Sequence, residues 1–513
     1  MKKDIDTEFL KELEFRRQFL LGPERYLHNK YWRIQKLKHQ LFLSIHKDLS
    51  FLSKEKDELR ITLIGLAVDC TSPAKKTDAI INNLLECFTD IYSVINASKP
   101  LAGRWILICQ DANNSYIFTD PCGLRQVYFS TGPNFWCASQ PTLIKQVEEL
   151  SITSDKSILK LRDSTAYKER ESAWIGDKTV YGNCLHLMPN HYLDLNKRSQ
   201  IRFFPKEEIA VAKNTEELVA KTATYLKNII NGLEHRSKVI LKLSAGYDSR
   251  LLLSASVDIS DKISNSTNNL GRLKNYHDDI YVPRNLARKF NLNHQIILNT
   301  DKNIPPWFSE ILSKNILEAR VSPLLPKIKS IYSEIINQRS NHIFLSGNVI
   351  EIVRIRAEAL KYEQSLVKHN APSQLEFLLK AFGYNNNFVK KEISTWLNSI
   401  DLSLVREATP LDMFYWEQRM GNWGALISAE HDIAAEIICP FNCRLLLEIC
   451  LKIPRKQRTP PDYTFFKKVI KKNWPELLLE PINPGPKGFG LFKKTLREKL
   501  PPAMVKHLRK LVP

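Results

Sequence analysis

The spacing of apolar residues divides the chain into three stretches. Over residues 1–60 the chain is rich in Lys, Arg, Glu and Leu, and apolar residues follow a helical stripe at Phe9, Leu10, Leu13, Phe15, Phe19 and Leu20. This stripe predicts a helical N-terminal arm over residues 1–60 that packs against the rest of the protein. A partner helix bound to the same stripe is the alternative.

Strand signals replace the helical stripe from residue 61 to residue 210. Short apolar runs predict strands at residues 61–68, 105–109, 116–119, 127–130 and 185–195. Polar turn residues at 111–114 and 120–123 separate three of these runs, as they do in hairpins. One helix is expected over residues 77–95, because their apolar positions follow helical spacing. Residues 61–210 are therefore predicted to form a sheet-rich domain.

Helices dominate the last stretch, residues 211–513, and short strands interrupt them. The strands are expected at residues 239–243, 264–267, 294–298 and 342–345. Strands that alternate with helices indicate a parallel sheet. Ligands of such sheets bind at the carboxyl ends of the strands, which is where the loop after residue 243 falls.

The charge balance and the cysteines narrow the classes of protein. The 513 residues carry 75 basic and 55 acidic side chains, a formal net charge of +20 that suits an anionic substrate, a nucleic acid or an anionic membrane surface. The longest apolar run is too short to span a bilayer, and the first six residues contain no signal-peptide core. The nine cysteines are scattered, without the spacing of a zinc site. A cytoplasmic protein with reduced thiols is expected.

The loop after residues 239–243 has the composition of an anion-binding turn. Ser244, Ala245 and Gly246 separate the apolar run from the start of an apolar helix. The N–H groups at such a helix N-terminus point at a bound phosphate, and the helix dipole favours its charge. Asp248 would repel a bare phosphate, so it is interpreted as a ligand of phosphate-bound Mg²⁺. A plain strand, turn and helix with a capping serine is the alternative.

Several stretches resemble motifs of one family, in the order that the family has them. The loop 244–250, Ser-Ala-Gly-Tyr-Asp-Ser-Arg, resembles the Ser-Gly-Gly-x-Asp-Ser loop of the ATP pyrophosphatases. The other stretches are Gly-Arg-Trp at 103–105, Asp-Pro-Cys-Gly-Leu-Arg at 120–125, the turn at 189–192, Ser-Gly-Asn-Val-Ile-Glu at 346–351, Glu436 with Pro440 and Phe441, Lys467 or Lys468, and Pro-Lys-Gly-Phe at 486–489. Their shared order over residues 61–495 resembles the asparagine synthetase family.

This resemblance implies a mixed α/β and α+β fold class. Residues 61–210 would form a degenerate Ntn-hydrolase-like sandwich of the glutamine-amidotransferase type. Residues 211–513 would form an α/β ATP-pyrophosphatase domain, which is adenine nucleotide α-hydrolase-like, with a helical C-terminal part. The layout is similar to that of β-lactam synthetases and lasso-peptide cyclases, which keep the amidotransferase-like domain and use an amine already present on the substrate.

The resemblance also implies an ATP-dependent, amide-forming ligase of natural-product, peptide or surface-polysaccharide biosynthesis, with ATP and Mg²⁺ as cofactors. A carboxylate would attack the α-phosphate of ATP, pyrophosphate would leave, and an amine would displace AMP from the acyl-adenylate. The nucleotide-binding residues carried over are Leu243, Ser244, Gly246, Asp248, Ser249, Ser346, Gly347, Lys467 and Lys468. Asp248 and Glu351 would hold Mg²⁺. Lys487 and Glu351 are the catalytic candidates, and Lys487 would stabilise the charge that develops during adenylation.

Some positions depart from the family pattern. Members that hydrolyse glutamine expose a cysteine as the processed N-terminus, whereas this chain begins with Met1 and has its first cysteine at Cys70. No glutaminase activity is therefore expected. The nucleotide loops are altered at Ala245, Asn348, Val349 and Ile350.

The alterations keep other hypotheses open. A catalytically degenerate relative that binds or scaffolds is the second hypothesis. A pyrophosphatase-type enzyme acting on tRNA is the third, and the amidotransferase-like half argues against it. The segment 487–513 is strongly basic and is interpreted as a solvated helix, with an anionic partner as the alternative. Arg419 and Trp423 are interpreted as packing residues rather than substrate contacts. The sequence identifies neither the carboxylate nor the amine.

Overall fold

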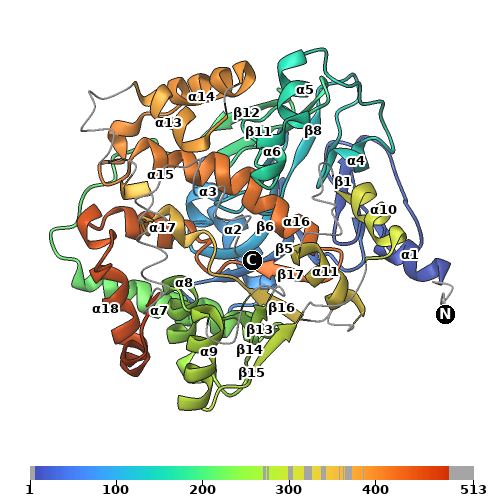
Figure 1. The fold of residues 1–513 in the computed structure, drawn as a ribbon. Helices are drawn as coiled ribbons and strands as arrows, with labels where there is room; N and C mark the ends of the chain where they lie inside the picture. Colours follow the sequence, from blue (N-terminus) through green and yellow to red (C-terminus); the bar gives the residue numbers. More distant parts are fainter. Residues whose placement is uncertain are drawn as a thin grey trace.

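A computed structural model describes residues 6–269, 273, 277–298, 304–316, 326–336, 342–356, 359–361, 363, 373–384 and 386–484. Along the chain, two six-stranded antiparallel sheets come before a five-stranded parallel sheet (Figure 1). The structure is therefore a mixed α/β protein. We call residues 6–210 the N-terminal half and residues 211–484 the C-terminal half.

The two antiparallel sheets belong to the N-terminal half. The first has the order β10-β8-β9-β1-β3-β2 and consists of β1 (Phe19–Gly22), β2 (Trp32–Lys36), β3 (Phe42–His46), β8 (Tyr128–Ser130), β9 (Cys137–Ala138) and β10 (Cys184–His186). The second has the order β12-β11-β7-β6-β5-β4 and consists of β4 (Phe51–Lys56), β5 (Leu59–Asp69), β6 (Leu101–Gln110), β7 (Ser115–Thr119), β11 (His191–Asp194) and β12 (Ser199–Arg202). The helices are α1 (Thr7–Leu13), α2 (Thr77–Cys87), α3 (Ile91–Ala97), α4 (Pro141–Ile144), α5 (Lys156–Asp163) and α6 (Thr165–Glu169).

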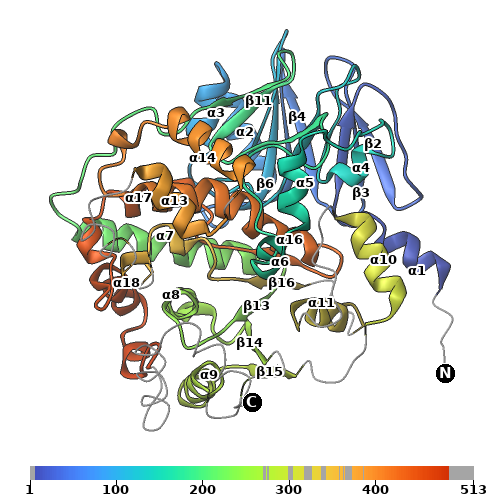
Figure 2. The same ribbon diagram turned by 45° about the horizontal axis from the view of Figure 1, so that its top comes forward.

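The two antiparallel sheets pack face to face around a common apolar core. In β6, Ile106 and Ile108 belong to the core between the sheets, whereas Trp105 and Leu107 pack with α2 and α3. Figure 2 shows α2 and α3 on one side of β4 and β6, with β2 and β3 on the other. Both faces of β6 are therefore buried, which explains why its sequence is a continuous apolar run instead of an alternating one.

The predicted helical arm over residues 1–60 is wrong. Among the described residues of that stretch only Thr7–Leu13 is α-helical, and four strands follow it. The helix ends because Phe15 and Arg17 have positive φ angles of 50° and 55°. Asn315 of the other half stabilises this turn, since its side-chain oxygen accepts the Phe15 N–H at 2.8 Å. The last two residues of the apolar stripe, Phe19 and Leu20, lie instead in β1, where both are completely buried.

The predicted helix over residues 77–95 is two helices in the structure. Asp90 begins α3 with a capping box, in which its side chain accepts the Ser93 N–H at 2.7 Å. Such a cap fixes an extended backbone before the first helical turn and so ends the continuity with α2. The strands expected at 105–109, 116–119 and 127–130 are confirmed as β6, β7 and β8.

The C-terminal half contains the parallel sheet and most of the helices. The sheet has the order β15-β14-β13-β16-β17 and consists of β13 (Lys238–Lys242), β14 (Ser264–Asn269), β15 (His294–Leu298), β16 (His342–Leu345) and β17 (Glu436–Ile438). The α-helices are α7 (Glu216–Glu234), α8 (Tyr247–Ala255), α9 (Asp278–Lys289), α10 (Pro306–Asn315), α11 (Pro326–Ile336), α13 (Gln374–Phe382), α14 (Asn387–Ser399), α15 (Pro410–Phe414), α16 (Ala425–His431), α17 (Arg444–Leu451) and α18 (Thr464–Asn473). Short 3₁₀ segments are η1 (Val257–Ile259), η2 (Ile350–Ile352), η3 (Leu402–Leu404), η5 (Arg455–Gln457) and η6 (Pro475–Leu479), and η4 (Tyr415–Gly424) is π-helical.

All neighbours in this sheet are parallel, which confirms the prediction from the alternating pattern. From β13 the chain adds β14 and β15 on one side, and then returns to add β16 and β17 on the other. The strand order therefore reverses between β13 and β16. A reversal of this kind leaves a crevice at the carboxyl ends of the two strands, which is where open α/β sheets bind ligands.

Within the described ranges, no helix has both the length and the apolar character needed to cross a membrane. Even α7, which has 19 residues, buries only one face and carries charged residues on the other.

The two halves share one buried interface. Arg104 of β6 donates two hydrogen bonds to Asp432, at 2.5 and 2.8 Å, and Arg125 pairs with Glu436 of β17. Both arginine side chains are 2% exposed, so these charges are almost completely removed from water. Asn442 adds a hydrogen bond from a neutral side chain, because its amide donates to the Asp120 carboxylate at 2.6 Å.

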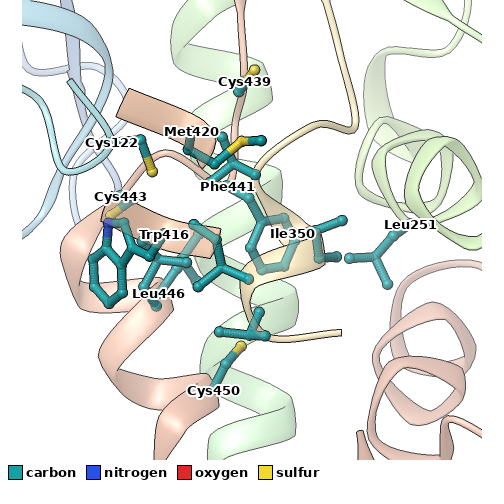
Figure 3. Packing of buried hydrophobic residues seen from close by; sticks show 14 of the residues in the cluster. Cys122, Leu251, Ile350, Trp416, Met420, Cys439, Phe441, Cys443, Leu446 and Cys450 are labelled. Atoms are coloured by element: carbon teal, nitrogen blue, oxygen red, sulfur yellow. The ribbon is translucent and has the colours of Figure 1, made fainter. Parts of the chain in front are cut away.

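Apolar side chains continue the same interface. Cys122 of the N-terminal half belongs to one core cluster with Trp416, Phe441 and Cys443 of the C-terminal half, and Figure 3 shows them from close by. The indole N–H of Trp416 donates to the backbone oxygen of Pro121 at 2.8 Å. The halves are therefore joined by a common core rather than by a surface contact.

We predict that Arg104→Ala lowers the free energy of unfolding by about 3–5 kcal/mol, because it leaves the buried Asp432 carboxylate without its main partner. Urea unfolding measures this loss. The exposed ion pair of Lys221 with Glu217 supplies the control, since Lys221→Ala should cost no more than about 0.5 kcal/mol. Arg104→Met combined with Asp432→Leu should recover part of the stability. A cost below about 1 kcal/mol for Arg104→Ala would contradict this role of the pair.

We also predict that stability falls as the pH drops from about 6.5 to about 4. Burial lowers the pKa values of His46, His186 and His191 to about 4 in the folded protein. Between about pH 6.5 and pH 4 the unfolded chain therefore takes up protons on these histidines and the folded protein does not. The stability that the neutral histidines contribute is fully present only above about pH 6.5. Each histidine adds up to about 1.4 kcal/mol per pH unit to the slope.

Urea midpoints measured at several pH values check this prediction. His186→Phe keeps a ring against Tyr128, which stacks on His186 with 4.5 Å between the ring centroids. Between pH 6.5 and pH 4, the free energy of unfolding of this variant should depend less steeply on pH, by the contribution of one proton. An unchanged slope would show that His186 is charged in the folded protein.

Candidate nucleotide site

A cavity of about 240 Å³ opens where the parallel sheet reverses its strand order. The structure brings together on this cavity six of the residues proposed from the sequence, Leu243, Ser244, Asp248, Ser249, Ser346 and Gly347. They come from the loops after β13 and β16, which are distant in sequence. Gly246 lies in the first of these loops, between Ser244 and the start of α8.

The loop after β13 is held by its own serine hydroxyls. The Ser244 and Ser249 hydroxyl oxygens lie 3.0 Å apart. The Ser249 oxygen accepts the Ser244 N–H at 3.1 Å, and the Ser244 oxygen accepts the Gly246 N–H at 3.2 Å. These contacts fix the curve of the loop and keep its polar groups at the N-terminus of α8, where a helix favours an anion.

A carboxylate from a neighbouring helix already occupies one donor of this loop. The Ala245 N–H donates to the Asp279 carboxylate at 3.0 Å, and Asp279 lies in the first turn of α9. A phosphate oxygen bound to the loop would compete with this acid for the same donor. Sequence reasoning missed Asp279, because its only signal was the acidic start of the helix after β14.

Asp248 is paired with an arginine that the sequence did not single out. Arg354 donates two hydrogen bonds to the Asp248 carboxylate, at 2.5 and 2.9 Å. Burial raises the pKa of Asp248 above its ordinary value, although Arg354 acts in the opposite direction. Arg354 follows η2 closely in the chain, so its position depends on the loop after β16.

The Glu351 carboxylate is close enough to Asp248 to raise its pKa, and it accepts a hydrogen bond from the hydroxyl of Tyr415. Burial and the Glu351 carboxylate raise the pKa of Tyr415, so the phenol stays protonated and keeps donating. Tyr415 is the first residue of η4, and nothing in its sequence context pointed to this contact.

Gly347 allows the two loops to approach each other. A Cβ atom at this position would lie 2.6 Å from the Cβ of Asp248, closer than two carbon atoms approach without strain. The close packing of the second loop against the first therefore explains why residue 347 is a glycine.

Val349 is held in a conformation that suits glycine. Its φ angle is 82° and its ψ angle is −40°, and its side chain is completely buried. β-Branched residues rarely adopt a positive φ, and such a conformation costs of the order of 1–3 kcal/mol. The β-branched side chain at this position therefore leaves strain in the loop that carries Glu351.

Asp248 and Glu351 are a suitable donor set for a magnesium ion, although both are engaged in the structure. Mg²⁺ in nucleotide sites uses one or two carboxylates together with phosphate oxygens. Among the described residues, no three His, Cys, Asp or Glu side chains form a metal-binding group. Asp248 lines the cavity and Glu351 does not, so Asp248 is the carboxylate placed to meet an ion that arrives with phosphates, on the condition that Arg354 releases at least one of its oxygens.

Two of the proposed lysines, Lys467 and Lys468, do not reach this cavity. Lys468 pairs with Glu216 of α7, and Lys467 lies 4.0 Å from Asp462. Neither of them lines the cavity. Lys487 lies outside the described residues, as does the basic segment 487–513.

Lys242 is a cation of the cavity that sequence reasoning missed. It is the last residue of β13, its ammonium lies 4.9 Å from the Phe344 ring centroid, and burial lowers its pKa. Glu334 of α11 and Asn268 of β14 line the same cavity. The sequence did contain a signal for Lys242. Side chains alternate between the two faces of a strand, so Lys242 points to the face opposite Leu241.

No protein-family model and no curated protein matches the chain. Among solved structures, glutamine phosphoribosylpyrophosphate amidotransferase from B. subtilis, complexed with ADP and GMP, matches with 9% identity and a TM-score of 0.23, over 56% of this chain and 61% of that chain. A structure described as the allosteric regulatory enzyme of purine biosynthesis matches with 8% identity and a TM-score of 0.25, over 59% of this chain and 78% of that chain. TM-scores this low do not establish a shared fold.

We predict that Asp279→Ala tightens ATP binding by about five- to ten-fold. The variant frees the Ala245 N–H and removes a negative charge, and the two changes together are worth roughly 1 to 1.4 kcal/mol. Asp279→Asn removes only the charge and should give a smaller gain. Asp261→Ala, which removes an exposed acid, should leave the affinity unchanged. Calorimetric titration with ATP checks the order of these affinities, and weaker binding by Asp279→Ala would show that the acid helps to hold the nucleotide.

Proposed function

We propose that the protein is an ATP-dependent ligase that joins a carboxylate to an amine through an acyl-adenylate, with AMP and pyrophosphate as products. The observation that carries this proposal is the convergence of two loops on one cavity. Ser244, Ser249, Ser346 and Gly347 meet at the reversal of the parallel sheet. Asp248 lines the same cavity, and Glu351, which does not line it, is close enough to raise the pKa of Asp248.

The residues of the cavity suit the charge changes of adenylation. A substrate carboxylate oxygen would form a bond to the α-phosphorus, and the bond from that phosphorus to the pyrophosphate oxygen would break. The leaving group gains negative charge, so donors that are already in place lower the barrier. The serine hydroxyls, the N-terminus of α8 and the ammonium of Lys242 would hold the phosphates. Asp248 and Glu351 would hold Mg²⁺, which supplies charge neutralisation when bound.

The second half-reaction consumes the acyl-adenylate. An amine nitrogen would attack the acyl carbon, AMP would leave, and the amine would lose a proton. We propose that this amine is already present on an amine substrate and does not come from glutamine hydrolysis. Among the described cysteines only Cys87 is exposed, and burial raises the pKa values of Cys109, Cys122 and Cys137. Thiols of this kind are poor nucleophiles at neutral pH.

A protein that keeps the fold as a binding or scaffolding module is the second candidate. The Arg354 guanidinium favours it, because it occupies both oxygens of Asp248 where a metal would bind. The Asp279 carboxylate favours it as well, since it occupies the Ala245 N–H. Two groups that a nucleotide complex requires, the Asp248 carboxylate and the Ala245 N–H, therefore already have partners within the protein.

We predict that ATP binds in the presence of Mg²⁺ and that Asp248→Asn weakens this binding at least five-fold. The effect should be much smaller without Mg²⁺, because the lost charge acts through the metal. Calorimetric titrations with and without MgCl₂ measure both values. Asp261→Asn removes a charge from an exposed position elsewhere and should behave as the wild type.

Product analysis then separates the two candidate functions. With a suitable acid and an amine, AMP and pyrophosphate should accumulate, without ADP. Identical ATP affinities for Asp248→Asn and the wild type would remove Asp248 from the site. Tight ATP binding without AMP formation over a broad panel of acids would favour the scaffolding candidate.

A further inference from the structure

A second, larger cavity lies between the two halves of the protein. Its volume is about 530 Å³, and both halves line it. The N-terminal half contributes the segment after α6 that includes Arg170 and Glu171. The C-terminal half contributes Arg356, the end of α13 and the face of η4 that carries Tyr415 and Arg419.

The lining of this cavity is strongly cationic. Its charged side chains are the cations Arg170, Arg356, Lys380 and Arg419 and the acids Glu169 and Glu171. Glu171 is already engaged, because Lys327 donates to its carboxylate at 2.7 Å and the Trp423 indole N–H donates to it at 3.0 Å. The cations of the cavity therefore exceed the available acids.

Arg356 and Arg419 form the core of this excess. Arg356 lies over the Tyr415 ring at 4.9 Å, and Arg419 stacks on the Trp423 ring at 3.9 Å. Within the described part of the chain, neither guanidinium donates a side-chain hydrogen bond or forms an ion pair. The two positive charges also repel each other. Burial is the main cause of the lowered pKa of Arg419, and the charge of Arg356 lowers it further. Packing holds both cations in place without satisfying their donors, which is the arrangement of an anion site.

The secondary structure explains why Tyr415 and Arg419 face the same cavity. Both lie in η4, and a π-helix has a wider turn than an α-helix, so residues four to five positions apart share a face. The interpretation of Arg419 as a packing residue is therefore incomplete. It packs on Trp423 and also presents its guanidinium to the cavity.

Tyr415 connects this cavity with the nucleotide site. Its ring lines the cationic cavity, and its hydroxyl donates to Glu351, which is close enough to Asp248 to raise its pKa. A ligand held by Arg356 and Arg419 would therefore lie against the ring whose hydroxyl contacts Glu351. Adenylation requires an acid near the carboxylates proposed to hold Mg²⁺.

We propose that the cationic cavity binds a small dicarboxylic acid, with one carboxylate on Arg356 and Arg419 and the other on Arg170 and Lys380 at its exposed rim. The inner carboxylate is the one that reacts. The outer one is recognised and remains free. The apolar middle of the molecule lies against Phe382 and Tyr384, which are both buried residues of the lining. Naming this acid as the substrate rests on the proposed function, whereas its binding does not.

Two carboxylates are favoured over one by the distribution of charge. The inner pair of arginines is enough for a single carboxylate, which a planar fork of donors recognises in a bidentate manner. Arg170 and Lys380 come from different halves of the chain and lie at the exposed rim, where Arg170 stacks over Tyr384 at 5.5 Å. A second anion would bring these two cations together and so link the two halves at the mouth of the cavity.

Calorimetry without nucleotide tests the binding. Glutarate and adipate are compared with their monomethyl esters, which have nearly the same shape and one charge less. The wild type should bind at least one diacid ten-fold more tightly than its ester. Arg419→Gln and Arg356→Gln should each weaken the diacid at least ten-fold, and Arg419→Lys should retain part of the affinity. Arg25→Gln, which changes an exposed arginine outside the cavity, should have no effect. Circular dichroism spectra and urea midpoints confirm that each variant is folded.

The rim is tested by the preference for diacid over ester. Lys380→Gln should reduce this preference to about three-fold or less while leaving the affinity for the ester unchanged, a result that a merely structural lysine would not give. Equal binding of diacids and esters by the wild type would overturn the proposal, as would unchanged diacid affinity in Arg419→Gln. Tighter binding of inorganic phosphate than of either diacid would overturn the assignment to a dicarboxylic acid.

The same experiments separate this inference from the proposed function. Diacid binding that depends on Arg419, without AMP formation when ATP, Mg²⁺ and an amine are added, would support the site and contradict the ligase. AMP formation with monocarboxylic acids, together with no diacid binding, would support the ligase and contradict the site.

Discussion

The structure depends on a set of arginine–carboxylate contacts that are buried between its two halves. Arg104 with Asp432 and Arg125 with Glu436 are removed from water, and each needs its partner because an isolated buried charge is costly. Arg202 adds a third contact, since it donates to the Glu417 carboxylate at 2.6 and 2.8 Å. Paired charges of this kind fix orientation more strictly than apolar contacts do, because they tolerate little displacement. The halves are thereby held in one arrangement, and the cationic cavity at their junction keeps its shape.

This interface gives the antiparallel sandwich a role that does not require chemistry of its own. The Gly-Arg-Trp and Asp-Pro-Cys-Gly-Leu-Arg stretches supply Arg104, Asp120 and Arg125, and all three contact the C-terminal half. Glu417 illustrates the same point from the other side. Burial raises its pKa, but Arg202 and Asn190 outweigh this effect, so the pKa is lower than usual and the carboxylate stays charged. The segment after α6 then forms one wall of the cationic cavity.

The candidate site is defined by competition for its charged groups. Asp248 is shared between Arg354 and the metal that it is proposed to hold, and the Ala245 N–H is shared between Asp279 and a phosphate. Val349 adds backbone strain close to the second carboxylate. A nucleotide would have to replace these internal contacts, so its affinity measures the difference between two sets of interactions rather than the strength of one. The cationic cavity differs, because among the described residues Arg356 and Arg419 form no ion pair, and the Glu171 carboxylate that acts on Arg419 already accepts from Lys327 and Trp423.

The sequence by itself determined the local features of this protein. Periodicity located four of the five strands of the parallel sheet and about half of the antiparallel ones, and the small residues after β13 located the loop that begins α8, because both depend on neighbours within a few positions. It failed for residues 1–60, where the apolar pattern fits a helix until turns such as Phe15, held by Asn315 of the other half, divide it. Only the tertiary structure decided that Arg354 pairs with Asp248, that Tyr415 reaches Glu351 and that Arg356 and Arg419 face one cavity. These contacts join elements that are far apart in sequence, and long-range pairing leaves no periodic signal in the chain.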